Sequence, residues 1–166
     1  MPMMAMGFLA AVTGCERPDR DAWAVDPPMT FDTARAVIET AEGPVPLLVE
    51  LAETESQRAQ GLMDRPSLPP EQGMLFVYPE TQDGRSGFWM YRTLIPLEIA
   101  FLDDDGEIVA ILEMEPCPSP NPQLCPIYSP GVPYVAALEV NRSFFGQWRV
   151  RVGDRFRLET EGDATS

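Results

Sequence analysis

The sequence predicts a mostly β fold: a β-rich α+β domain with a small barrel or a strongly curved, antiparallel-dominated sheet of about seven to eight short strands, and two short helices. Three observations favour this class. Runs that favour strands alternate with turn signals along the chain. The 166 residues include 18 prolines, which require many extended, rigid loops. The two helical segments are too short and too few to cover a parallel α/β sheet.

The first expected elements are a hairpin and a helix. The runs 35–40 and 46–52 favour strands and flank the turn sequence Ala-Glu-Gly-Pro. Thr54 and Gln57 then have the spacing of a capping box. We therefore expect a short helix with one apolar face, which ends before Pro66.

Six further strands are expected in the rest of the domain: 73–78, 87–91, 97–102, 107–113, 134–140 and 155–159. Apolar residues alternate in the run 134–140, which predicts a strand buried on one face only. Asn141 is expected to cap a short second helix that carries Phe144, Phe145 and Trp148.

The segment Asp103-Asp104-Asp105-Gly106 lies between two expected strands. Its Asp-Gly pair supplies the positive φ of a tight hairpin turn. Three successive aspartates also suggest a calcium loop, but the alternating ligand spacing and the closing glutamate of such a loop are missing. We therefore expect a solvated turn and no metal site.

Charge and composition exclude several classes of function. The chain has 26 acidic and 12 basic side chains, a formal net charge of −14 and no histidine, and every basic residue is arginine. Without histidine there is no Ser-His-Asp or Cys-His catalysis and no histidine-ligated metal, and without lysine there is no Walker phosphate loop or Schiff base. The acidity also disfavours nucleic acid and electrostatic docking on anionic lipid. We expect no cofactor.

The N-terminus has the pattern of an export signal. Residues 3–12 form an apolar run that is too short to span a bilayer. It ends in Val12-Thr13-Gly14-Cys15, which resembles the lipobox of bacterial lipoproteins and implies cleavage before Cys15 and acylation of its thiol. No arginine or lysine precedes the run, and a buried N-terminal strand with an incidental cysteine is the alternative.

The chain divides into a lipoprotein-type signal segment (1–15), a proline-rich tether (16–33), one β-rich globular domain (34–160) and a frayed tail (161–166). We expect an exported bacterial protein, held on the periplasmic side of a membrane by its lipid anchor. A monomer is the favoured oligomeric state.

Two cysteines remain after Cys15, and they are Cys117 and Cys125 in a proline-rich loop. In an oxidising compartment two nearby thiols normally pair, so we expect a structural disulfide. A redox-active pair is an alternative, although its cysteines are usually two residues apart at a helix start. The same two thiols could also ligate a metal ion or stay unpaired.

A series of short motifs runs in order through residues 34–160: VELAET (49–54), QRAQGLMDR (57–65), GMLFVY (73–78), FWM (88–90), TLIPLEI (93–99), PC (116–117), CPIY (125–128) and GDR (153–155). The series resembles the bacterial and archaeal family called domain of unknown function 192. The resemblance implies a compact, mostly β domain that is frequently secreted or lipid-anchored and has no established activity.

Two positions depart from the usual pattern of that family. Tyr91 and Arg92 stand where a basic residue and an asparagine are expected, and Glu98 replaces a more common aspartate. An asparagine amide donates and accepts hydrogen bonds, whereas Arg92 only donates them. A function that depends on that amide would be altered in this chain.

Six residues are the candidate ligand-binding residues: Trp89, Arg92, Glu98, Asp103, Arg58 and Tyr128. If the strands 87–91 and 97–102 pair, an aromatic ring, an arginine and a carboxylate surround one concavity, a combination that suits sugars or peptides. The alternative is a core position for Trp89 and internal pairing of Glu98 with an arginine.

We interpret the chain as an uncharacterised envelope protein that acts as a binding or accessory module for a cell-wall fragment or a protein partner. A carboxylate-dependent hydrolase of an envelope glycan is the alternative, because two carboxyl groups with different pKa values can cleave a glycosidic bond. A purely structural accessory lipoprotein is a third interpretation. No spacing in the sequence marks a catalytic pair, so no catalytic residue is assigned and enzymatic activity is left open.

Overall fold

The computed structural model describes residues 29–160. The expected signal segment with Cys15, residues 16–28 of the expected tether and the expected tail lie outside the described residues, and these expectations stay predictions. The first strand of the described part begins at Asp32, slightly before the expected start of the domain.

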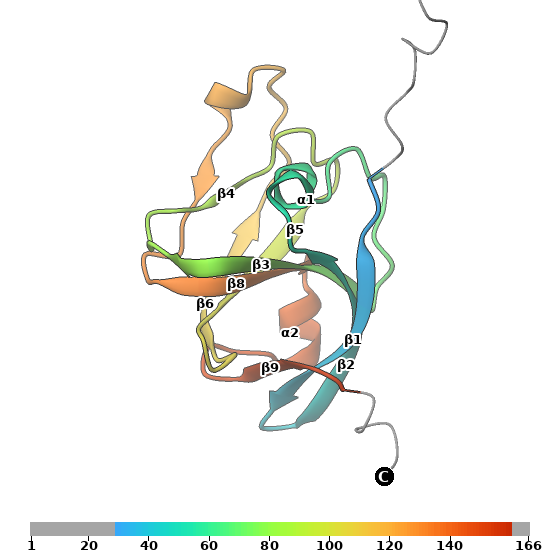
Figure 1. Cartoon of the computed structure of the whole chain (residues 1–166). Coiled ribbons are helices and arrows are strands. Elements are labelled where there is room, and N and C mark those ends of the chain that lie inside the picture. Colours follow the sequence, from blue (N-terminus) through green and yellow to red (C-terminus); the bar gives the residue numbers. More distant parts are fainter. Residues whose placement is uncertain (1–28, 161–166) are drawn as a thin grey trace, which may run out of the picture.

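A seven-stranded mixed sheet forms the body of the molecule (Figure 1). Its strands in spatial order are β6 (Ile108–Met114), β5 (Leu97–Leu102), β8 (Tyr134–Asn141), β3 (Gln72–Gln82), β2 (Gly43–Ala52), β1 (Asp32–Thr40) and β9 (Arg155–Leu158). Neighbouring strands are antiparallel, except that β2 and β3 are parallel and are connected through α1 (Glu55–Gln60). A second, two-stranded sheet pairs β4 (Phe88–Trp89) with β7 (Ile127–Tyr128).

The large sheet is strongly curved, and its concave side surrounds α2 (Phe144–Trp148) (Figure 1). In the described residues its two edges meet at a single isolated bridge, between Glu107 and Arg155. A single bridge is not a continuous ladder, so the sheet is not a closed barrel. The predicted class, a mostly β domain with a strongly curved sheet and two short helices, is confirmed.

Apolar side chains pack on both faces of this sheet. The concave cluster combines residues of the sheet with the aromatic residues Phe144 and Phe145 of α2. The convex cluster lies under α1 and β4, and includes Leu62, Phe88 and Met90. Because β5 and β8 are central strands covered on both sides, a polar side chain on either face is removed from water unless it reaches a gap in the packing.

Most predicted elements form. The hairpin of β1 and β2 and the strand Leu97–Leu102 are present, and Thr54 and Gln57 make both hydrogen bonds of the predicted capping box. The prediction that the run 134–140 is buried on one face only is wrong. Leu138 of the concave cluster and Ala137 of the convex cluster are both fully buried, because the chain covers both faces of β8.

Two other predictions need correction. Asn141 does not cap α2: the N-cap residue is Ser143, and the Asn141 amide donates to the main-chain oxygens of Leu68 and Pro69 at 2.9 and 3.1 Å. The expected pairing of the strands 87–91 and 97–102 is also wrong, because β4 pairs with β7 and β5 pairs with β6 and β8.

The predicted turn and disulfide are present. The Asp103 carboxylate accepts hydrogen bonds from the amides of Asp105 and Glu107 at 3.0 and 2.8 Å, and Gly106 has a φ of 78°. Cys117 and Cys125 form a disulfide with a Cα separation of 5.5 Å. Within residues 29–160 no helix is long and apolar enough to cross a membrane.

Candidate functional site

A small pocket of about 30 Å³ opens on the convex side of the sheet, where the end of α1 meets β4 and β8. Its wall contains the segment 58–63, the aromatic residues Phe76, Phe88 and Trp89, and the polar residues Thr93 and Glu139. A volume of this size accommodates one small polar group rather than a whole sugar ring or amino acid. We call it the Glu139 pocket.

Glu139 is the most unusual residue of this pocket. It lies in β8, directly opposite Met74 of β3 and Ile99 of β5, and only 4% of its surface is exposed. Its carboxyl group forms no hydrogen bond or ion pair with any described residue. Burial raises the pKa of Glu139 to about 8, so the group is mostly protonated at neutral pH.

Thr93 is the second buried polar residue of the pocket. It is 7% exposed, and its amide donates to the Met90 oxygen at 3.2 Å. Its hydroxyl group has no hydrogen-bond partner among the described residues. Neither the Thr93 hydroxyl nor the Glu139 carboxyl is among the fully buried polar atoms that lack a hydrogen bond in the described residues, so both keep contact with solvent through the pocket, where a ligand or a water molecule can complete their hydrogen bonding.

Arg58 lines the same pocket but is held on other groups. Its guanidinium donates to the main-chain oxygen of Glu53 and to that of Val77, the latter at 2.8 Å, and it lies 5.0 Å from the centre of the Tyr78 ring. These contacts fix α1 on β3. They also leave Glu139 without a counter-ion that lowers its pKa, since burial is the cause of the shift.

The turn after α1 closes the pocket tightly. Gly61 has a φ of 47°, and a Cβ at this position would lie 3.3 Å from the Phe76 ring. A side chain there would therefore combine an unfavourable backbone conformation with a steric conflict at the pocket wall. This explains why the end of α1 can approach β3 so closely.

Trp89 stands at the mouth of the pocket. Its side chain remains 42% exposed, and its ring centre lies 5.7 Å from that of Tyr91. A large exposed aromatic ring beside unpartnered polar groups is typical of sites that bind sugars or peptides. A core position for Trp89 does not fit this exposure.

Three connections hold Trp89 in place. β4 pairs with β7 through Phe88 with Tyr128 and Trp89 with Ile127. The amide of the disulfide-bonded Cys117 donates to the Met90 oxygen at 3.2 Å. The pocket wall therefore depends on the disulfide-linked segment 117–128 as well as on the sheet.

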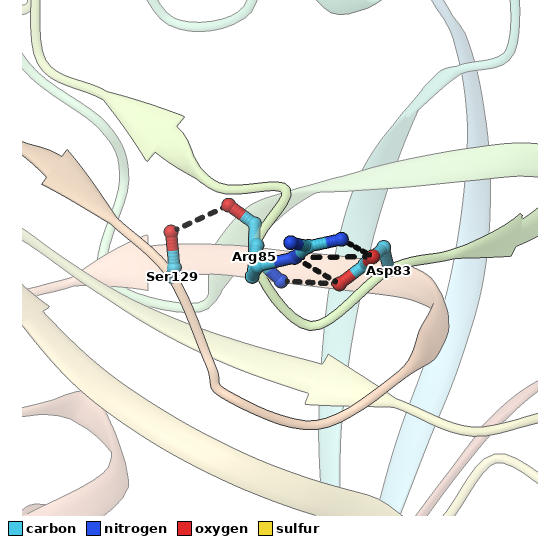
Figure 2. Close-up of polar contacts among 3 residues, drawn as sticks. All are labelled: Asp83, Arg85 and Ser129. Carbon is cyan, nitrogen blue, oxygen red and sulfur yellow. Dashed lines mark hydrogen bonds and ion pairs between the residues drawn. The ribbon is translucent and has the colours of Figure 1, made fainter.

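The loop before β4 is tied to the loop after β7 (Figure 2). The Ser129 hydroxyl donates to the Arg85 main-chain oxygen at 3.0 Å, and the Arg85 guanidinium contacts the Asp83 carboxylate at 2.8 Å. The ion pair is largely exposed, so it contributes little to stability. Its role here is to shape the loop that leads into β4.

The structure brings two of the six candidate residues, Arg58 and Trp89, into the Glu139 pocket. Arg92 lies outside it in an exposed ion pair with Asp64. The Asp103 carboxylate is held by the hairpin turn described above.

Glu98 and Tyr128 contact other parts of the chain. The buried Glu98 carboxylate accepts the amide of Phe145 at 2.9 Å, and thus caps α2 in place of a Ser143 side chain. The Tyr128 hydroxyl accepts the Glu115 amide at 3.1 Å. Neither residue lines the Glu139 pocket.

Sequence reasoning missed Glu139. The signal for Glu139 was a carboxylate inside the apolar run Val135-Ala136-Ala137-Leu138-Glu139-Val140. In a strand with one face in solvent, such a residue would point into water. Glu139 is buried because α1 and β4 pack over that face of β8. Thr93 lies in the motif 93–99 that follows Trp89 and Arg92, and the structure places it in the pocket wall.

A second, larger hollow lies elsewhere. It is an open groove of about 540 Å³ lined by residues of β1, β2 and the segment 69–72, including Pro46, Leu48 and Pro70. Its polar residues are Arg35, Glu71, Gln72 and Glu159. It contains no buried unpartnered polar group among the described residues, so the Glu139 pocket is the better candidate site.

Comparisons with other proteins agree with this architecture. The model of the family DUF192, described as "Uncharacterized ACR", matches residues 31–158. The chain is similar to a crystal structure from Sinorhizobium meliloti 1021, whose description suggests a transcription regulator, with 34% identity and a TM-score of 0.70 over 78% of this chain and 96% of that one. It is also similar to a protein of unknown function from Novosphingobium aromaticivorans DSM 12444, with 27% identity and a TM-score of 0.67 over 87% of this chain and 99% of that one. No curated protein matches the chain.

Proposed function

The chain belongs to the DUF192 family of uncharacterised proteins, and on this premise we propose that it is a lipid-anchored envelope protein that binds a cell-wall fragment at the Glu139 pocket. One observation carries the binding function. The exposed Trp89 ring stands beside a pocket that contains two buried polar groups without partners among the described residues, Glu139 and Thr93.

The arrangement favours a ligand with an apolar face and a small polar substituent. The Trp89 ring offers a surface on which the apolar face of a sugar or a peptide side chain can stack. A polar substituent of that ligand would enter the pocket and satisfy Glu139 and Thr93. The small pocket volume selects for one such substituent, while most of the ligand stays outside.

The location at the envelope is supported by two independent features. The sequence Val12-Thr13-Gly14-Cys15 has the order of residues expected where a lipoprotein signal is cleaved. The disulfide between Cys117 and Cys125 is typical of a protein that matures in an oxidising compartment. The periplasmic side of a bacterial membrane meets both conditions.

We do not extend DNA binding or glycan hydrolysis to this chain. A net charge of −14 repels phosphate, which argues against the role suggested for the Sinorhizobium meliloti protein. The carboxylates of Glu98 and Asp103 accept main-chain hydrogen bonds, so both have structural tasks. Neither shares the Glu139 pocket, where a hydrolase would need its second carboxyl group.

Isothermal titration calorimetry tests the binding function. The ligands are soluble disaccharide-peptides released from peptidoglycan by a muramidase, titrated into the full chain carrying Cys15→Ala. We expect saturable binding that Trp89→Ala weakens at least about fivefold, since stacking on one aromatic ring contributes about 1–3 kcal/mol. Leu158→Ala is the matched control, because Leu158 is 39% exposed and lies in β9, outside the pocket. If both variants bind the disaccharide-peptides with equal affinity, the proposed binding site is wrong.

Fractionation of cells tests the anchor. The wild-type protein should take up labelled fatty acid and sediment with membranes, and Cys15→Ala should release it into the soluble periplasmic fraction. Unchanged membrane association of the variant, without label, would contradict lipidation at Cys15.

A further inference from the structure

The Glu139 carboxyl group lies in its pocket without a counter-ion among the described residues. Arg58 is the one basic residue in the described wall of the pocket, and its guanidinium is held by the main-chain oxygens of Glu53 and Val77. A buried carboxyl group can be neutralised in two ways: it keeps a proton, or a cation enters beside it. The protein supplies no such cation from its described residues.

None of the titratable groups that face Glu139 provides a counter-ion for its carboxylate. α1 contributes Arg58, and β3 contributes Tyr78, whose pKa is raised chiefly by burial, so the phenol stays neutral. β5 places the apolar Ile99 directly opposite Glu139. β4 contributes Phe88 and Trp89, which carry no titratable group.

Apart from Arg58, whose guanidinium is held by main-chain oxygens, the wall suits a cation. Besides Glu139, the unpartnered group in the described wall is the Thr93 hydroxyl, whose oxygen can accept a hydrogen bond. The aromatic residues Phe76, Phe88 and Trp89 surround the same space, and aromatic rings attract cations in partly desolvated sites. The net charge of −14 raises the concentration of cations near the surface.

We propose that the Glu139 pocket binds the primary ammonium group of the cell-wall ligand, with Glu139 as its counter-ion and the Thr93 hydroxyl as a second acceptor. This assignment rests on the proposed binding function and names the chemical group that enters the pocket. An ammonium group is about the size of a water molecule, which matches a volume of about 30 Å³. The ligand is therefore an amino sugar or a peptide with a free amine, whose apolar part contacts Trp89.

The binding step exchanges one proton for the ligand cation. Before binding, the Glu139 carboxyl group is mostly protonated at neutral pH, because burial raises its pKa to about 8. When R–NH₃⁺ enters, the Glu139 proton leaves to the buffer and the carboxylate pairs with the ammonium, which keeps all its hydrogens. One cation enters and one proton leaves, so the charge of the pocket does not change.

Titration of the full chain carrying Cys15→Ala with methylammonium chloride tests this exchange. Below about pH 8 the affinity should rise about tenfold per pH unit, and it should level off above that pH. Calorimetry in two buffers of different ionisation enthalpy, at a pH about 1.5 units below the carboxyl pKa, should show release of nearly one proton per bound cation. Sodium chloride at equal ionic strength and methanol, a neutral molecule of similar size, serve as control ligands.

Two variants locate the site. Glu139→Gln keeps the shape of the side chain and removes its charge, so methylammonium binding should be lost while the protein remains folded. Thr93→Val removes one acceptor and should weaken binding by about three- to tenfold. Carbon-13 NMR of the Glu139 carboxyl group adds a direct readout, since methylammonium should lower its pKa and sodium should not.

The outcomes separate this inference from the proposed function. Affinity that does not change with pH, or binding retained by Glu139→Gln, overturns the ammonium assignment. If the disaccharide-peptides bind in a Trp89-dependent way but methylammonium does not bind even above the carboxyl pKa, the assignment fails and the binding function stands. If methylammonium binds as described and no wall fragment binds, the pocket chemistry stands and the wall ligand is wrong.

Discussion

Within residues 29–160, each face of the seven-stranded sheet buries one glutamate, and the two residues have different surroundings. Glu98 of β5 points to the concave face and accepts the Phe145 amide at 2.9 Å. Glu139 of β8 points to the convex face, lies diagonally next to Glu98 in the ladder, and contacts no hydrogen-bond partner among residues 29–160. The comparison distinguishes a buried carboxylate that accepts a main-chain hydrogen bond from a buried carboxyl group that has no hydrogen bond to a described residue.

The difference follows from what covers each face. α2 comes directly after β8, and the amide of Phe145 near its N-terminus donates to Glu98, so the helix end and the carboxylate satisfy each other. The convex face is covered by α1 and the β4–β7 sheet, and neither element donates a hydrogen bond to Glu139 in the described part of the chain. A buried glutamate is therefore evidence for function only when its hydrogen bonds are missing.

The largest expected effect is the pH dependence of stability caused by Glu139. The folded chain keeps this proton up to about pH 8, whereas the unfolded chain releases it near pH 4.5. Between these values the folded state binds more protons, so the free energy of unfolding falls as pH rises, by at most about 5 kcal/mol. Urea denaturation across and slightly beyond this pH range should show Glu139→Gln gaining stability relative to wild type as pH rises.

The control for this prediction is a neutral change in the same pocket. Thr93→Val removes a polar group but no titratable one, so its stability relative to wild type should not vary with pH. A difference between Glu139→Gln and wild type that stays constant over the same pH range would show that Glu139 does not hold a proton in the folded protein.

The second largest effect concerns Glu98. Glu98→Ala leaves the Phe145 amide without an acceptor inside the core and should lower the free energy of unfolding by about 2–3 kcal/mol. Glu98→Gln keeps an acceptor and should cost about 1 kcal/mol or less. Chemical denaturation measures both, and ligand binding by the folded variants should match wild type. An alanine variant as stable as wild type would mean that the Glu98 carboxylate does not stabilise α2.

The third effect concerns the disulfide, which supports the elements that cover the convex face but not α2 on the concave face. Cys117→Ser combined with Cys125→Ser should lower stability by about 2–3 kcal/mol, because the bridge closes a short loop. The loss should be concentrated at the convex face, where the Cys117 amide contacts Met90 next to Trp89. Hydrogen exchange should therefore accelerate in β4 and β7 more than in α2. Uniform acceleration would contradict this placement.

The fold was largely predictable, and the site was predictable in part. Strands such as Leu97–Leu102 and the capping box of Thr54 and Gln57 depend on local periodicity and spacing, which a sequence shows directly. Arg58 and Trp89 were identified from their chemistry and do meet in one pocket. Glu139 was not, because its burial depends on the position of α1, and contacts between distant segments leave no local pattern.

The smallest effect concerns Arg92, a candidate residue that lies outside the pocket. Its φ is 56°, a left-handed conformation that asparagine tolerates better than most residues, which gives a physical reason for the asparagine that the family resemblance implies at this position. Arg92→Asn relieves this backbone strain and removes the exposed ion pair with Asp64, so the two changes offset each other. We expect a melting temperature within about 2 °C of wild type and unchanged affinity for wall fragments.

Arg92→Ala loses the ion pair without the backbone benefit and should melt slightly lower than Arg92→Asn. A large loss of affinity in both variants would instead place Arg92 in the binding surface and extend the site beyond the Glu139 pocket.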